Sequence, residues 1–234
     1  MEPPDQGAES LKVEAQQILA NLEAVVGERR ARNLEHGLQE RVQALKSFQH
    51  ERFRQTYADL LAGGRYAGAA QFFLDDLYGP GDFAQRDDQF ARVVPALARL
   101  FPREILSTVL ALSELHALSE QLDTAMGRAL DGVAIDGASY AAAWRAVGEP
   151  AQRERQIALM LDVGRALDRY TRNPLLRHSL RLMRGPAHAA GMGALQTFLE
   201  RGFDTFREMR GAEDFLALIA QRERELIAQL FAKP

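Results

Sequence analysis

Apolar residues recur at intervals of three and four positions along nearly the whole chain, and this spacing restricts what the chain can fold into. Leu34, Leu38, Val42 and Leu45 form one such series. These intervals place apolar side chains on one face of an α-helix, whereas a half-buried strand needs strict alternation. No segment alternates for long enough to predict a strand, and no fixed period indicates a solenoid. We therefore expect an all-α fold, an irregular multi-helix bundle of roughly nine helices.

Proline and glycine indicate where the helices begin and end, since proline suits the first helical position and glycine the position after the last one. Gly27 either divides the first helical segment or leaves one long helix. Pro95 should bend the helix for which Asp82 is the expected N-cap. The expected helices cover about residues 11–61, 66–77, 82–100, 103–128, 137–147, 150–171, 174–183, 187–209 and 212–232.

The helical pattern predicts one domain after a short tail. Residues 1–8 are rich in proline, glycine and acid, so we expect them to be disordered. The 234 residues of the chain allow one large domain or two small ones. We expect residues 9–234 to form a single all-helical domain, with a weak seam near residues 129–136. The segment 103–128 is apolar nearly all round in its first half, which is typical of a central helix.

The composition excludes several kinds of site. The chain has no cysteine, which rules out disulfides, thiolate zinc sites, iron–sulfur clusters and a catalytic cysteine. The net charge of −3 is too small to favour polyanion binding over the whole surface. No run of 18 uncharged apolar residues could span a membrane, and because residues 1–9 are polar and acidic we expect no secretory signal. We expect a cytoplasmic protein.

The most distinctive string runs from Phe72 to Pro80 and reads FFLDDLYGP; Arg-Asp-Asp follows at 86–88. Together with the LSELHALS run at 112–119, it resembles a signature of bacterial conserved hypothetical all-α proteins (FFLxDLYGP type), and that resemblance implies no activity. Aromatic rings beside paired carboxylates could form a polar pocket in an apolar wall, with the carboxylates as acid and base or as cation ligands. Alternatively, the rings are core anchors and the acids cap helices or pair with arginines.

His116 is the second candidate feature. At helical spacing it lies close to Glu120 and Asp123, and a carboxylate can orient a histidine for proton transfer or metal binding. The string around His116 is similar to the haem-ligating helix of globins, but the expected helix is much longer and no matching distal histidine is apparent. None of the five histidines follows a glutamate by three positions, so a di-iron carboxylate site is not expected. The candidate ligand-binding residues are Phe72, Phe73, Asp75, Asp76, Tyr78, Arg86, Asp87, His116 and Glu120.

A run of arginines between residues 151 and 184 is the third feature. A basic helix face of this kind could hold phosphate groups or nucleic acid. Tyr170 is the only aromatic residue in that range that could stack on a base, so nucleic acid is an unlikely partner and a solvated face is favoured. The arginines are residues 153, 155, 165, 169, 172, 177, 181 and 184.

Two functions from different classes follow. Because no strong catalytic or cofactor motif is present, the first is a non-enzymatic module that binds a protein partner or itself. The alternative is a small-ligand-binding bundle (haem or metal included) or a catalytic one, with its pocket between the segment Phe72–Asp88 and His116; the sequence identifies no cofactor. A cavity that joins His116 to Asp75 or Asp76 would favour the second function, and a closed core the first.

Overall fold

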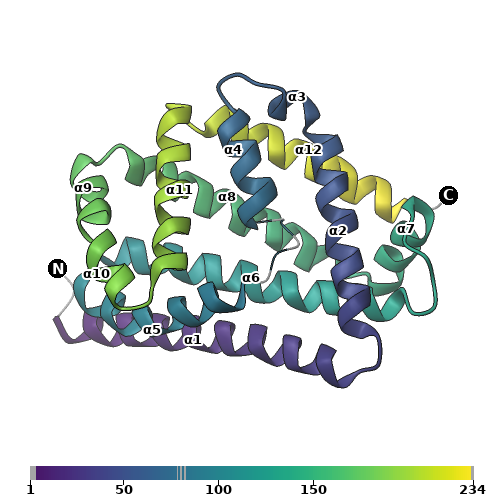
Figure 1. The fold of residues 1–234 in the computed structure, drawn as a ribbon, viewed down its shortest axis with the longest axis horizontal. Coiled ribbons are helices and arrows are strands. Elements are labelled where there is room, and N and C mark those ends of the chain that lie inside the picture. Colours follow the sequence, from purple (N-terminus) through teal and green to yellow (C-terminus); the bar gives the residue numbers. More distant parts are fainter. Residues whose placement is uncertain (1–3, 78, 80, 82, 233–234) are drawn as a thin grey trace.

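In the computed structural model, which describes residues 4–77, 79, 81 and 83–232, every regular element is helical (Figure 1). The all-α prediction is therefore confirmed for this part of the chain. The elements are α1 (Pro4–Leu34), α2 (Leu38–Thr56), α3 (Ala58–Leu61), α4 (Ala67–Phe72), the π-helical turn η1 (Phe73–Leu77), α5 (Ala84–Leu100), α6 (Arg103–Ala129), α7 (Gly137–Val147), α8 (Pro150–Thr171), α9 (Pro174–Leu182), α10 (Arg184–Ala189), α11 (Gly193–Met209) and α12 (Glu213–Phe231).

Local capping signals explain why most boundaries match the prediction. Pro150 and Pro174 begin α8 and α9, where the missing N–H of proline costs no helical hydrogen bond. The Asp136 carboxylate accepts a hydrogen bond of 2.8 Å from the Ser139 backbone N–H at the start of α7. Asp82, the expected cap of α5, lies outside the described residues.

The observed helices are more numerous than the nine expected because three predicted segments, 11–61, 66–77 and 187–209, are each divided. The first is divided at Gly37 and not at Gly27, since Gly37 has a φ of 69°, a left-handed conformation that glycine adopts without strain. Gly191, with a φ of 70°, separates α10 from α11. Helix α1 begins at Pro4, inside the segment expected to be a tail, because proline fits the first turn of a helix.

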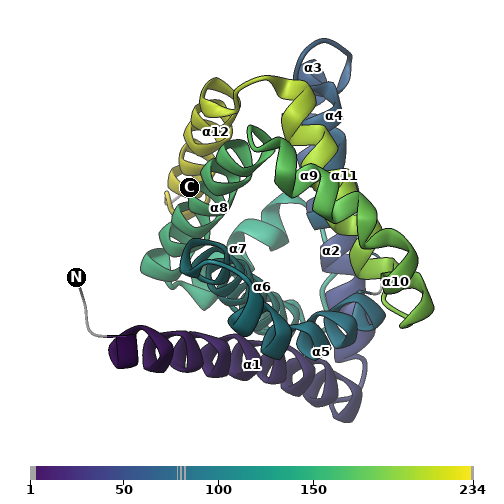
Figure 2. The ribbon, with the colours of Figure 1, turned by 90° about the vertical axis from the view of Figure 1, so that its left-hand side faces the viewer.

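Helix α6 runs through the middle of the molecule and contacts α1, α2, α7 and α8 (Figure 1). Helix α1 packs along its outer side together with α5. Viewed from the end of the molecule, α8 and α12 lie on one side, whereas α11 and α4 lie on the other (Figure 2). Side chains from helices around α6 can therefore approach one central region.

Apolar side chains form three separate clusters around this region. The largest joins α2, α4, η1, α8, α11 and α12, and includes Phe53, Phe206 and Phe215. A second joins α2, α6, α7 and α12, and a third joins α1, α5 and α6. Met126 and Trp144, on opposite sides of the segment 129–136, share the second cluster, so side chains before and after that segment pack together.

Candidate functional site

A cavity of about 250 Å³ lies between the three apolar clusters. Its wall is built from α2, η1, α5, α6, α7, α8, α11 and α12, with a small contribution from α1. Most of the wall is apolar, including Leu112, Phe198 and Ile227, but ionisable side chains enter it from several helices. An apolar cavity with a few polar groups directed into it is the usual form of a small-molecule site.

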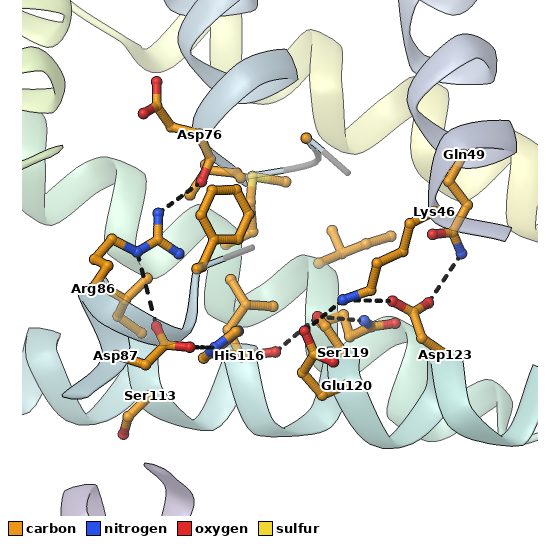
Figure 3. A pocket seen from close by; sticks show the side chains of 18 of the residues that line it. Lys46, Gln49, Asp76, Arg86, Asp87, Ser113, His116, Ser119, Glu120 and Asp123 are labelled. Atoms are coloured by element: carbon orange, nitrogen blue, oxygen red, sulfur yellow. Dashed lines mark hydrogen bonds and ion pairs between the residues drawn. The ribbon is translucent and has the colours of Figure 1, made fainter. Parts of the chain in front are cut away.

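The polar side of the cavity is a row of side chains on α6 (Figure 3). His116, Glu120 and Asp123 are four and three positions apart, which places them on one face of the helix. Helix α5 brings Asp87 to one end of this row, and α2 brings Lys46 to the other. The row therefore places the imidazole of His116 and the charged side chains around it along one wall of the cavity.

His116 and Asp87 form a pair at the cavity wall. Nε2 of His116 lies 2.9 Å from Oδ2 of Asp87, and Nη2 of Arg29 lies 2.6 Å from the same oxygen. Burial opposes the ionisation of Asp87, but the hydrogen bonds and charges of His116 and Arg29 prevail and lower its pKa. The ionised carboxylate thus fixes the orientation of the His116 ring, as in sites where a histidine exchanges protons.

Glu120 is the centre of a second charged group. Its carboxylate lies 2.6 Å from both Arg32 Nη1 and Lys46 Nζ, and only 4% of the residue is exposed. Although burial opposes ionisation, Lys46 and Arg32 together lower the pKa of Glu120 to about 2. Burial raises the pKa of the neighbouring Asp123, whose Oδ1 accepts a hydrogen bond of 3.1 Å from Gln49.

Arg153 enters the wall from α8 and is almost entirely buried, with 3% of its surface exposed. Its guanidinium stacks over the Trp144 ring at 3.8 Å from the centroid. Gln156 accepts a long hydrogen bond of 3.5 Å from Nη1 and donates one of 2.9 Å to Ser119. Burial lowers the pKa of Arg153, because charge is costly where water is excluded.

The structure brings together five of the nine residues predicted for the site. Asp76, Arg86, Asp87, His116 and Glu120 all line the cavity, so the expected proximity of His116 to the 72–88 segment is found. Arg86 donates a hydrogen bond of 3.0 Å to the Asp76 backbone oxygen. Burial and the charge of Asp75 raise the pKa of Asp76, against the effect of Arg201 and Arg86.

Three of the other predicted residues, Phe72, Phe73 and Asp75, do not line the cavity. The fourth, Tyr78, lies outside the described residues. Phe72 packs against Phe198, and Phe73 belongs to the largest apolar cluster. Asp75 is exposed and lies 3.6 Å from Nη2 of Arg201. Phe73 and Asp75 lie in the π-helical turn at 73–77, whose wider winding shifts side chains away from α-helical positions, whereas Phe72 precedes this turn at the end of α4.

Sequence reasoning missed Lys46 and Trp144, and it placed Arg153 on a solvated basic face. Most of the other arginines in that stretch do lie at the surface and face acids. Arg155 binds Glu114, and Arg184 binds Glu200. The position of Arg153 differs because Arg153, Ile157 and Met160 share the face of α8 that faces the cavity.

We expect the substitution Asp87→Asn to lower the free energy of unfolding by about 1.5–3 kcal/mol, because it removes the carboxylate charge that strengthens the hydrogen bonds with Arg29 and His116. Urea unfolding followed by circular dichroism at pH 7 measures the change. The matched control is Asp88→Asn, at the exposed neighbouring position, which should have little effect. Equal stability of the two variants would contradict the assignment of Asp87 as the residue that holds Arg29 and His116.

No three potential metal ligands come together among the described residues, so we propose no metal site. None of the described helices combines the length and apolar character that a membrane-crossing segment needs.

A family model described as "Domain of unknown function (DUF8198)" matches residues 28–234. The matched range includes all of the cavity wall apart from the contribution of α1. The match agrees with the expected similarity to proteins without an assigned activity. No curated protein and no solved structure matches the chain.

Proposed function

The chain belongs to this family of unknown function, and we propose that it binds a small organic ligand in the cavity beside His116. The observation that carries the proposal is the cavity of about 250 Å³ with the side chains of His116, Glu120 and Asp123 in its wall. Protein interiors are normally packed as densely as organic crystals, with few voids larger than a water molecule. A cavity of this size with fixed polar groups is therefore favoured as a binding site over a packing defect.

The wall supports recognition by both shape and polarity. Leu112, Leu115, Phe198 and Ile227 provide apolar surface for the body of a ligand. The His116–Asp87 pair provides a group that can accept or donate a proton at the ligand. Binding with proton exchange is thus the chemistry that these residues support.

Filling the cavity tests the proposal. Trp144 is the only tryptophan in the sequence and lines the cavity, so its fluorescence should report on small organic molecules that bind there. We expect saturable changes with compounds that carry one aromatic ring, and we expect Leu112→Phe to weaken them about tenfold or more because the added ring occupies the cavity. Leu118→Phe, on the same helix but not in the wall, is the control. Equal binding by both variants would contradict the proposed site.

A protein-interaction module, the first of the two functions expected from the sequence, is the second candidate, and α9 is the observation that favours it. This helix buries none of its residues, and Leu175, Leu182 and Met183 are more than half exposed. Exposed apolar patches often indicate association. Light scattering after size-exclusion chromatography tests self-association: a mass that rises with concentration in the natural chain, and falls to one chain in Leu175→Ser/Leu182→Ser, would support it. A single-chain mass at every concentration would exclude self-association.

A further inference from the structure

Arg153 carries a positive charge in the cavity wall and forms no ion pair with an acidic side chain of the described part of the chain. No carboxylate of the described residues lies within 4 Å of its guanidinium, which contacts the Trp144 ring and the amide of Gln156 and interacts electrostatically with Tyr140. Asp123, a carboxylate whose charge acts on Arg153 from farther away, is engaged by Gln49 and Lys46. Such an arrangement is rare, because a buried charge is costly unless it is paired.

The other basic side chains of the wall are all paired. Lys46 lies 2.6 Å from Glu120, and Arg52 lies 3.1 Å from Glu223. Arg86 lies 3.8 Å from Asp87 and stacks on two aromatic rings. The described wall therefore has one positive charge that is not compensated by a neighbouring carboxylate, which matches a ligand with one negative charge.

The unused atoms of Arg153 are also the two that bind a carboxylate side-on. Nε and Nη2 of Arg153 have no hydrogen-bond partner among the described atoms and are covered by protein atoms, so the guanidinium must turn toward the cavity to present them to a ligand. Two residues along α8, the same two atoms of Arg155 donate hydrogen bonds of 2.8 and 2.7 Å to the two oxygens of Glu114. Arg54 binds Glu51 in the same way. This parallel pair of hydrogen bonds fits the planar geometry of a carboxylate.

Apolar side chains surround the rest of the cavity near Arg153. Ile157 and Met160 follow Arg153 on the same face of α8, and Trp144 covers one side of the guanidinium. An apolar cavity of about 150 Å³ can hold benzene. A cavity of about 250 Å³ therefore accommodates an aromatic or branched apolar group together with a short acidic chain.

We propose that the ligand of this cavity is a small apolar monocarboxylic acid whose carboxylate is bound by Nε and Nη2 of Arg153. This inference rests on the proposed function, because it specifies the chemical class of the ligand at the same site. The apolar body of the acid lies against Trp144, Ile157 and Met160. Arg153 is thus the residue that determines specificity for an acid over a neutral compound.

Trp144 fluorescence measures the binding of three probes with similar rings. The probes are 3-phenylpropionate, its neutral amide and the doubly charged phenylphosphonate at pH 8. We expect the acid to bind at least about tenfold more tightly than the amide, the range for hydrogen bonds between charged groups. Arg153→Met should abolish that preference by weakening the binding of the acid far more than that of the amide, whereas Arg153→Lys, which keeps the charge without the planar pair of donors, should lose part of it. Arg155→Met, on the exposed face of α8, should bind as the natural chain does.

The outcomes separate this inference from the proposed function. If the amide binds as tightly as the acid, and Leu112→Phe weakens both, the cavity binds ligands but the carboxylate inference is wrong. Tighter binding of phenylphosphonate than of the acid, or an unchanged preference in Arg153→Met, also overturns it. If no monocarboxylate from acetate to 3-phenylpropionate and neither of the other probes changes Trp144 fluorescence at millimolar concentration, both the function and the inference fail.

Discussion

The substitution Glu120→Gln should lower the free energy of unfolding by about 3–5 kcal/mol at neutral pH, the usual result of removing one partner of a buried ion pair. Glu120 is 4% exposed and lies between Arg32, on one side of α6, and Lys46, on the side of the cavity. Glutamine keeps the shape of the side chain but not its charge. The guanidinium of Arg32, with a side chain 3% exposed, would then remain buried without its counter-ion.

The same substitution should change how stability depends on pH. The pKa of Glu120 falls from 4.5 to about 2 on folding, so the unfolded chain binds a proton at a higher pH than the folded chain does. The ionised carboxylate therefore stabilises the fold fully above about pH 4.5, and this contribution is lost as the pH falls toward 2. The shift corresponds to about 3 kcal/mol. Glu120→Gln should remove this part of the acid destabilisation.

Urea unfolding at pH 7 and at steps down to pH 2 measures both effects. The matched control is Glu114→Gln, also on α6, whose carboxylate pairs with Arg155 at the surface. Exposed ion pairs contribute about 0–1 kcal/mol, so this control should unfold nearly as the natural chain does. If Glu120→Gln loses no more stability than the control, Glu120 does not hold its basic neighbours as described.

The sequence predicts the helices well because their signals are local. Pro150, Pro174 and Asp136 act within one helical turn, and each begins or caps a helix as expected. The helix break at Gly37 could not be predicted in this way, and the sequence pattern indicates only Gly27 as a possible break. The break at Gly37 depends on how α1 and α2 pack against α6.

The candidate site could be predicted only in part, for a similar reason. Helical spacing correctly places His116 and Glu120 close together, since both lie on one straight helix. Phe72, at the end of α4, and Phe73, at the start of the π-helical turn, both pack in the core, as the alternative interpretation of these rings predicted. The burial of Arg153 could not be predicted from helical spacing alone either, because it depends on the helices packed against α8. The sequence did contain one indication of it: the apolar residues Ile157 and Met160, four and seven positions later, lie on the same helix face.

The substitution Arg153→Met should have the opposite effect to Glu120→Gln and raise the free energy of unfolding by about 1–3 kcal/mol in the absence of ligand. The gain equals the usual cost of a buried polar group without partners. The stacking on Trp144 offsets some of that cost in the natural chain, but the thioether of methionine also packs favourably against an indole ring. For a chain of this length the midpoint of thermal unfolding should rise by about 2–10 °C.

Thermal unfolding with and without 3-phenylpropionate distinguishes a ligand-binding arginine from a structural one. The natural chain should gain stability from the acid by mass action, whereas Arg153→Met should start higher and gain little. Arg155→Met should behave like the natural chain in both conditions. A midpoint several degrees lower in Arg153→Met would mean that Trp144 and Gln156 already compensate the charge, and that Arg153 stabilises the fold. A higher midpoint combined with lost binding would mean that stability is given up at Arg153 for recognition, as at functional residues in general.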